Sequence, residues 1–189
     1  TIVITDTTTN CQATDSVTID GPTTVLAITT IVTPITCVSG GIVTINAVGG
    51  WGGNTYELTL PDSTVLGPQG SNVFSNLSQI GMYTVTATDA NGCQVITTFT
   101  LNTPSNPIAT IDASSDYCYD GNGSTLVVNA SVGLPPYEYS INGGAFVSSN
   151  TFTNLIPGTY DIIVRDANGC TFALPSQTIA NQLTASAVL

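Results

Sequence analysis

The chain has 189 residues, 42% of them hydrophobic, which is enough for one large domain or two small ones with ordinary cores. Twelve acidic residues face a single basic one, Arg165, and there is no Lys or His, so the formal net charge is -11. This charge excludes nucleic acid as a partner. Without Lys or His the usual general base, Schiff-base amine and imidazole metal ligand are missing, so we expect no catalytic residue and no enzyme.

Residues 1–22 open in a strand-like segment, TIVITD, with no signal peptide before it. From Asp6 to Cys11 they align, after one inserted residue, with the stretch from Asp89 to Cys93. We therefore expect residues 1–22 to be the C-terminal strands of a preceding repeat, and the chain to be cut from a longer one.

Residues 23–104 and 105–182 repeat the same motifs at a period of about 80 residues. One repeat contains GMYTVTATDANGC and the other GTYDIIVRDANGC, each ending in a cysteine. The matching pairs are Cys37 and Cys118, Tyr56 and Tyr137, Asn72 and Asn150, Tyr83 and Tyr160, Asp89 and Asp166, and Cys93 and Cys170. A unit of this size can bury its own core, so we expect two domains, followed at 183–189 by the first strand of another repeat.

Within a repeat the pattern has period two, as where Tyr160, Ile162 and Val164 alternate with Asp161 and Arg165. Turn residues recur roughly every 8 to 12 positions, and no segment shows a capped helical period. The sequence therefore predicts an all-β fold of tandem immunoglobulin-like β-sandwich repeats with about seven strands each.

Two kinds of turn support this fold. The segment Leu155 to Tyr160 resembles the tyrosine corner of immunoglobulin-like sandwiches, and Tyr83 takes the same place in the earlier repeat. The Asp-Ala-Asn-Gly sequences that start at Asp89 and Asp166 suit tight hairpins, in which Asn and Gly accept positive φ and Asp caps its own backbone.

Five cysteines occupy repeat-equivalent positions, and none has CxxC spacing. Since Cys37 and Cys93 flank one body, and Cys118 and Cys170 flank the next, we predict one disulfide within each repeat. Cys11 would then pair with a partner outside the chain. Two thiols per unit without His make only half a zinc site, so disulfides are favoured over metal, and they imply an oxidising compartment.

A glycine-bearing loop places Asp116, Asp120 and Asn122 close together in sequence, which could supply oxygen ligands for calcium. The counterpart loop after Cys37 has no such side chain, which favours a solvated turn instead. Apart from calcium, we expect no cofactor.

Trp51 lies between paired glycines, where its ring could stack on a sugar or on a partner protein. Such a ring more often plugs the end of a core or a domain junction. Glu57 and Glu138 occur once per repeat, so hydrolysis by paired carboxylates would need two repeats to share a cleft.

With DANGC present twice, a Gly-x-Tyr strand before each, and the segment PPYEY at 135–139, the chain resembles the SprB-type repeat of Bacteroidota cell-surface adhesins. Gly52 to Asn54 and Met82 depart from that pattern in the first repeat. The resemblance implies a long secreted surface protein, exported by type IX secretion and serving adhesion or gliding motility. It also implies O-glycosylation at Asp-Ser/Thr triplets, of which the candidate residues are Thr7, Ser16 and Ser63.

The leading hypothesis is thus a structural and adhesive segment of an extracellular, cell-surface adhesin stalk or filament. Its partners would be neighbouring repeats of the same chain or filament, with surface polysaccharide or another cell beyond them. No apolar run approaches the roughly 18 residues of a membrane span, so we expect no membrane insertion. The alternatives are a glycan-binding module that uses Trp51, and a self-assembling filament subunit joined by strand complementation.

Overall fold

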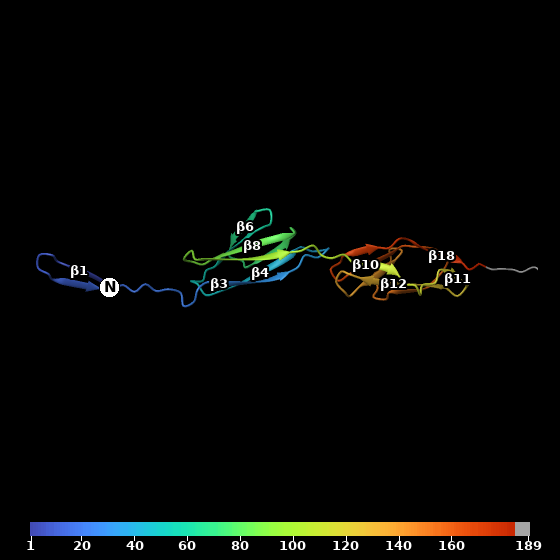
Figure 1. Ribbon diagram of the computed structural model, residues 1–189, viewed down its shortest axis with the longest axis horizontal. Helices are drawn as coiled ribbons and strands as arrows, with labels where there is room; N and C mark the ends of the chain where they lie inside the picture. The colour runs from blue at the N-terminus through green and yellow to red at the C-terminus, as the bar shows by residue number, and fades with distance from the viewer. Residues whose placement is uncertain (184–189) are drawn as a thin grey trace, which may run out of the picture.

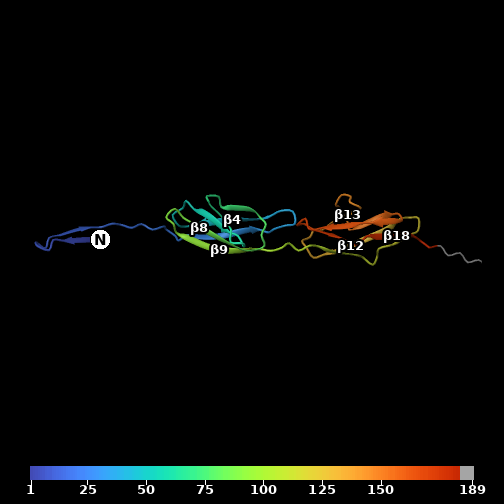
Figure 2. The same ribbon diagram turned by 90° about the horizontal axis from the view of Figure 1, so that it is seen from above.

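The computed structural model describes residues 1–183, and every regular element in that range is a β-strand. Three parts follow one another along the long axis of the molecule, a terminal hairpin and then two sandwiches, as Figures 1 and 2 show. The all-β prediction is confirmed. The strand expected at 183–189 falls almost wholly outside the described residues. Within the described residues there is no helix of the length and apolarity that a membrane crossing needs.

The terminal hairpin pairs β1 (Ile2–Thr5) with β2 (Gln12–Asp15). The first body contains β3 (Ala27–Thr33), β4 (Gly41–Val48), β5 (Thr55–Thr59), β6 (Val65–Gln69), β7 (Val73–Leu77), β8 (Gly81–Thr88) and β9 (Gln94–Leu101). The second body contains β10 (Ile108–Ile111), β11 (Cys118–Tyr119), β12 (Ser124–Ser131), β13 (Glu138–Ile141), β14 (Thr151–Leu155), β15 (Gly158–Tyr160), β16 (Ile162–Arg165), β17 (Thr171–Ala173) and β18 (Gln177–Asn181).

Each body is a sandwich around its own core. In the first, the sheet β3-β4-β7 faces the sheet β6-β5-β8-β9. In the second, β10-β12-β14 and β13-β16-β17 take the corresponding places, and β11-β18-β15 forms a further small sheet. All strand pairs are antiparallel except β11 with β18. The two cores share no residue, so each body is held together by its own apolar side chains.

Alternation of residue types along the strands places these cores. On β8 the side chains of Tyr83, Val85 and Ala87 are fully buried, while the threonines between them are only half-buried. On β16 Ile162 and Val164 are buried in the same way. The predicted period-two pattern is therefore confirmed, and each buried Val or Ile contributes about 1.5–3 kcal/mol relative to an exposed position.

An asparagine performs the same task in both bodies. The side-chain amide of Asn72 donates to the carbonyl of Ile45 (2.9 Å), and the carbonyl of Asn72 accepts from the N–H of Ile45 (2.8 Å). Asn150 makes the same two bonds with Val128, at 3.0 and 2.9 Å. The residues that match in sequence therefore also match in hydrogen bonding.

The predicted tyrosine corner is present in both bodies. The hydroxyl of Tyr83 donates to the carbonyl of Gln79, and that of Tyr160 donates to the carbonyl of Ile156, each at 2.8 Å. The ring of Tyr83 is fully buried and stacks on Phe99 with 5.0 Å between centroids. Burial raises the pKa of Tyr83, although the bond to Gln79 opposes the rise. The corner thus closes the end of the first core with a hydroxyl that stays protonated.

Replacing Tyr83 with Phe tests the contribution of this corner. The variant leaves the Gln79 carbonyl without its partner, so we expect the free energy of unfolding of the first body to fall by about 1 kcal/mol. Urea titration followed by the fluorescence of Trp51, the one tryptophan of the sequence, reports on that body specifically. The control is Tyr117→Phe, which removes a hydroxyl bonded to Gln177 on the exposed surface of the second body. Equal midpoints for Tyr83→Phe and the parent chain would contradict the role of the corner.

Candidate functional site at the junction of the two bodies

The two bodies follow each other head to tail, so opposite ends of equivalent sandwiches meet. Strand β9 runs from the turn Asp89–Cys93 to Leu101 and continues into the linker 102–107, which places that turn at the end of the first body away from the second. The loop between β3 and β4 lies at the other end, facing the second body. The second body presents its own turn, Asp166–Cys170, to this loop (Figure 1). We call these two turns the Asp–Cys turns.

A disulfide crosses the junction between Cys37 of the first body and Cys170 of the second, with 5.0 Å between their Cα atoms. The predicted bonds Cys37–Cys93 and Cys118–Cys170 are therefore wrong. In each predicted pair the two cysteines lie at opposite ends of one sandwich, separated by strands of up to eight residues, or roughly 27 Å. A disulfide needs Cα atoms within about 7 Å, and only the neighbouring body offers a cysteine that near.

The disulfide is one of several contacts at this junction. The N–H of Cys37 donates to the carbonyl of Asn168 (3.0 Å). Beside it, the side chain of Val38 covers Gly169, where a Cβ atom would lie 2.7 Å from Val38 Cγ1 and where φ is +74°. Glycine is thus needed at position 169 for two reasons: the turn has a positive φ there, and Val38 of the neighbouring body leaves no room for a Cβ atom. Val38 and Asn168 are not recognisable from the sequence, since neither type signals a contact between domains.

A buried carboxylate organises the Asp–Cys turn at the junction. Asp166 is 4% exposed. Its Oδ1 accepts from the N–H groups of Asn168 and Cys170, both at 2.9 Å, and its Oδ2 accepts from the N–H of Leu134 at 2.9 Å. The first two bonds shape the turn, as predicted. The third ties the turn to the loop between β12 and β13, a contact that no motif around Leu134 predicts.

Asp89 makes the same three bonds in the first body, with the N–H groups of Asn91 (3.0 Å), Cys93 (2.9 Å) and Trp51 (3.1 Å). Burial raises the pKa of the Asp89 carboxyl, but these three donors together outweigh burial and hold the pKa below its ordinary value. Positive φ is found at Gly92 (84°) but not at Asn91, so the prediction of positive φ for the asparagine is wrong.

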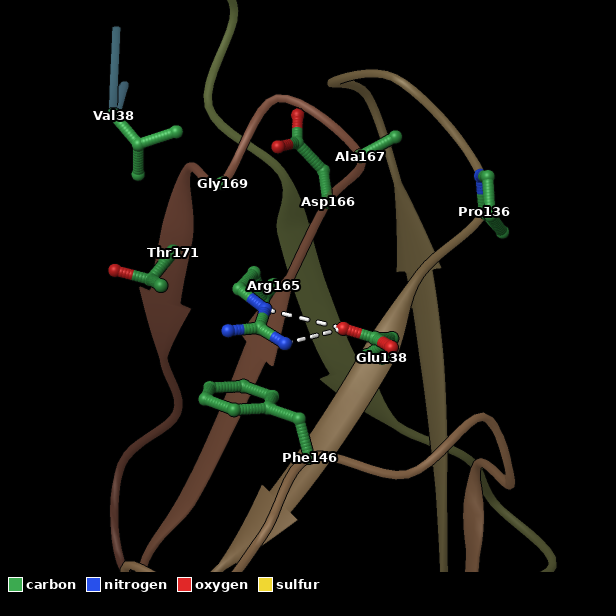
Figure 3. A pocket seen from close by; sticks show the side chains of 9 residues that line it. All are labelled: Val38, Pro136, Glu138, Phe146, Arg165, Asp166, Ala167, Gly169 and Thr171. Carbon is green, nitrogen blue, oxygen red and sulfur yellow. Dashed lines mark hydrogen bonds and ion pairs between the residues drawn. The ribbon is translucent and has the colours of Figure 1, made fainter. Parts of the chain in front are cut away.

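An open groove of about 530 Å³ lies along the junction. Figure 3 shows Val38 at its upper rim and the ion pair of Arg165 with Glu138 below the turn. The pair joins neighbouring strands β16 and β13, with Nη2 of Arg165 2.5 Å from Oε2 of Glu138. The guanidinium also lies 4.0 Å from the ring centroid of Phe146. The sole basic side chain of the sequence is therefore already engaged, in a partly exposed pair that adds about 0–1 kcal/mol.

Trp51 lies at the far end of the first body, where the residue is 41% exposed and its backbone N–H donates to the carboxylate of Asp89. Leu134 has the equivalent place in the second body, because its N–H bonds to Asp166. Leu134 lies at the end of the second body that faces the first. This equivalence favours a role for Trp51 at a domain junction, and stacking on a ligand stays a prediction.

The loop proposed for calcium uses its polar groups locally. Oδ1 of Asp116 accepts from the N–H of Cys118 (2.9 Å), and Oδ1 of Asp120 accepts from the N–H of Asn122 (2.8 Å). The side-chain amide of Asn122 donates to Oδ2 of Asp120 (3.1 Å). Across residues 1–183 no three His, Cys, Asp or Glu side chains are grouped so that they could hold a metal ion. These bonds are those of solvated turns, and calcium binding stays a prediction.

The remaining predicted residues lie on the surface. Thr7, Ser16 and Ser63, the candidates for O-glycosylation, are all exposed at turns or just after a strand, and their modification stays a prediction. Cys11, Cys93 and Cys118 are exposed and unpaired in the described part of the chain.

In comparisons with known proteins, no family model and no curated protein matches this chain. The fold and the junction therefore define the class of protein. It is a row of β-sandwiches in which a disulfide links one body to the next.

The pairing of Cys170 can be checked with trypsin, because Arg165 is the one basic residue and cleavage after it separates Cys37 from Cys170. After thiols are blocked and the unreduced chain is denatured, we expect the peptide 166–189 to stay attached to 1–165 in Cys118→Ser but to be released in Cys37→Ser. Gel electrophoresis without reductant separates the two outcomes. The reverse pattern would restore the pairing of Cys118 with Cys170.

The lowered carboxyl pKa values predict a loss of stability in acid. The pKa of Asp89 lies below its ordinary value, and hydrogen bonds from Ser114 and Asn129 lower that of Asp112 to about 2. Groups whose pKa falls on folding stabilise the protein fully above the unfolded-state pKa near 3.8, and that contribution disappears as pH falls toward 2. We expect the unfolding free energy to drop steadily between pH 5 and pH 2, measured by urea titration at each pH.

The variant Asp89→Asn isolates the turn in this measurement. It should be less stable than the parent chain at pH 7, and the difference should shrink as pH falls, because acid removes the same charge from the parent. Asp20→Asn, which removes one negative charge from an exposed position, is the matched control. A difference between Asp89→Asn and the parent that is constant from pH 7 to pH 2 would refute the assignment.

Proposed function

We propose that this chain is a load-bearing, repetitive part of an extracellular adhesin stalk or filament, whose immediate partners are neighbouring bodies of the same kind. The observation that carries the proposal is the disulfide between bodies, Cys37–Cys170. Adhesion and gliding are the roles that the resemblance to SprB-type repeats implies. The extracellular location accords with the disulfide, since such bonds persist in oxidising compartments.

The position of the disulfide determines how a pulling force would pass through the molecule. Cys37 follows β3, the first strand of the first body, and Cys170 precedes β17, near the end of the second. Tension applied at the two ends would run along β3, across the S–S bond and into β17. Residues 38–169 lie outside that path, so β4 to β9 and β10 to β16 would carry little of the load. Covalent shielding of this kind suits a stalk.

The same bond also stabilises the pair of bodies without force. It closes a loop with a sequence separation of 133 residues. In the chain-entropy model a loop of this length contributes about 5 kcal/mol, which is comparable to the whole stability of a small domain. The bond ties together two bodies whose cores share no residue.

The charge and the protease sites of the chain accord with an extracellular location. The acidic side chains outnumber the basic ones by twelve to one, which keeps the chain soluble and self-repelling. Arg165 is engaged by Glu138 and Phe146, and it is the one position that trypsin-like proteases could cleave. Glycans at Thr7, Ser16 and Ser63 would further cover this surface.

Single-molecule force spectroscopy with handles at the two termini tests the load path. With the disulfide intact, we expect residues 38–169 to contribute no length when the chain is stretched to its limit. Reduction should add about 460 Å, since the separation of 133 residues corresponds to about 3.5 Å per residue. Cys37→Ser should show the longer extension without reductant, and Cys93→Ser should behave like the parent. Equal extension with and without reductant would disprove the proposal.

A further inference from the structure

We propose that Cys93 and Cys118 each form a disulfide with a neighbouring body, of the same kind as the bond between Cys37 and Cys170. Cys118 would bond the Asp–Cys turn of a following body, and Cys93 would bond the β3–β4 loop of a preceding one. The partner in both cases is a further body of the kind found in this chain. The inference rests on the proposed stalk and assigns the cysteine chemistry that joins its units.

The first body presents an uncovered copy of the surface that Cys37 and Val38 occupy on the second. The two Asp–Cys turns have the same sequence and the same carboxylate bonds. Cys170 is 1% exposed because the first body covers it, whereas Cys93 is exposed. Gly92 shows the same contrast, since a Cβ there would meet nothing within 4 Å, whereas one at Gly169 would meet Val38. Both bodies therefore have this binding surface at their Asp–Cys turn, and it is covered in the second body but uncovered in the first.

The second body presents the other half. Cys118 matches Cys37 in sequence, and it lies on β11 beside β18, at the end of the second body away from the first (Figure 1). Its pairing with Ala180 places it next to the strand from which the chain leaves the body. The loop that holds Cys37 likewise ends near the last residue of β9, because Gly41, which begins β4 directly after the loop, packs against Leu101. Each of these two cysteines thus marks the end that a following body would meet.

The hairpin adds a third example of the turn. The N–H of Asp6 donates to the carbonyl of Cys11 (2.9 Å), as Asp89 does to Cys93 (3.0 Å) and Asp166 does to Cys170 (2.9 Å). In Figure 1 this turn lies at the outer end of the hairpin, so all three turns face the same way along the molecule. A row of such units repeats one bond, from the β3–β4 loop of each body to the turn of the next.

Formation of each bond needs an oxidant. Two thiols, one from Cys118 and one from the turn of the following body, lose two protons and two electrons as the S–S bond forms. A small disulfide such as oxidised glutathione accepts them and leaves as two thiols. Both Cys93 and Cys118 are exposed, so such an oxidant can reach them.

A tandem chain tests the inference. Residues 23–182 are appended after Gln182, so that Gln182 and residues 23–26 link β18 of the first copy to β3 of the second over a length similar to the existing linker 102–107. The chain is refolded in a glutathione redox buffer and alkylated without reductant. Intact-mass spectrometry then counts the alkylated thiols. In one variant the first copy carries Cys93→Ser, and in its matched control the second copy carries the same change. Cys37–Cys170 in both copies, found by peptide mapping, verifies folding.

We expect two alkylated thiols in the variant and four in the control, because Cys118 bonds Cys93 of the second copy in the variant alone. Mapping should recover that cross-linked peptide. Four alkylated thiols in both chains, with both Cys37–Cys170 bonds formed, would overturn the inference. That result would leave the load path untouched, since the force measurement on the present chain depends on Cys37–Cys170 only.

Discussion

A buried carboxylate that accepts three backbone hydrogen bonds holds together the end of each sandwich. In the second body Asp166 fixes the path of the turn through Asn168 and Cys170, and fixes the loop between the two sheets through Leu134. Such charge-assisted bonds are short and strong, and a carboxylate buried without them would be costly. The turn, the loop and the cysteine therefore keep one geometry, which a disulfide to another body requires.

This geometry gives the junction its directional character. At this junction the end with the β3–β4 loop supplies Cys37 and the end with the Asp–Cys turn supplies Cys170, so the two bodies join head to tail. Gly169 shows how closely the two surfaces fit, because a single methyl group there would collide with Val38. A heterologous contact of this kind, repeated along one axis, produces an extended row of bodies and not a closed ring.

The two bodies share the same turns and hydrogen bonds at their ends but differ in the continuity of their strands. Strand β9 is continuous over eight residues, whereas the equivalent stretch of the second body is divided into β17 and β18 around Pro175. Proline cannot donate to a ladder, which explains the break. The tyrosine corner, the pair of hydrogen bonds made by Asn72 or Asn150, and the Asp–Cys turn are present in both bodies despite this difference. The end structures are therefore more uniform than the strands, which is what a junction between bodies demands.

Neighbouring residues were enough to predict the strand pattern, the main turns and which residues of one repeat correspond to those of the other, although the second body has nine strands where about seven were expected. Alternation of apolar and polar residues reports which side chains are buried, and Tyr83 and Asp89 stand in turns of recognisable composition. These properties are local, so they can be read from neighbouring residues.

The pairing of the cysteines depends on how the two bodies are arranged in space. Repetition makes Cys93 and Cys170 equivalent, so pairing Cys37 with either one respects the pattern equally well. The choice depends on which ends of two sandwiches face each other, and the distance between those ends is set by strand length and by the linker 102–107. Since a disulfide forms only over a few ångströms, that arrangement in space selected Cys170.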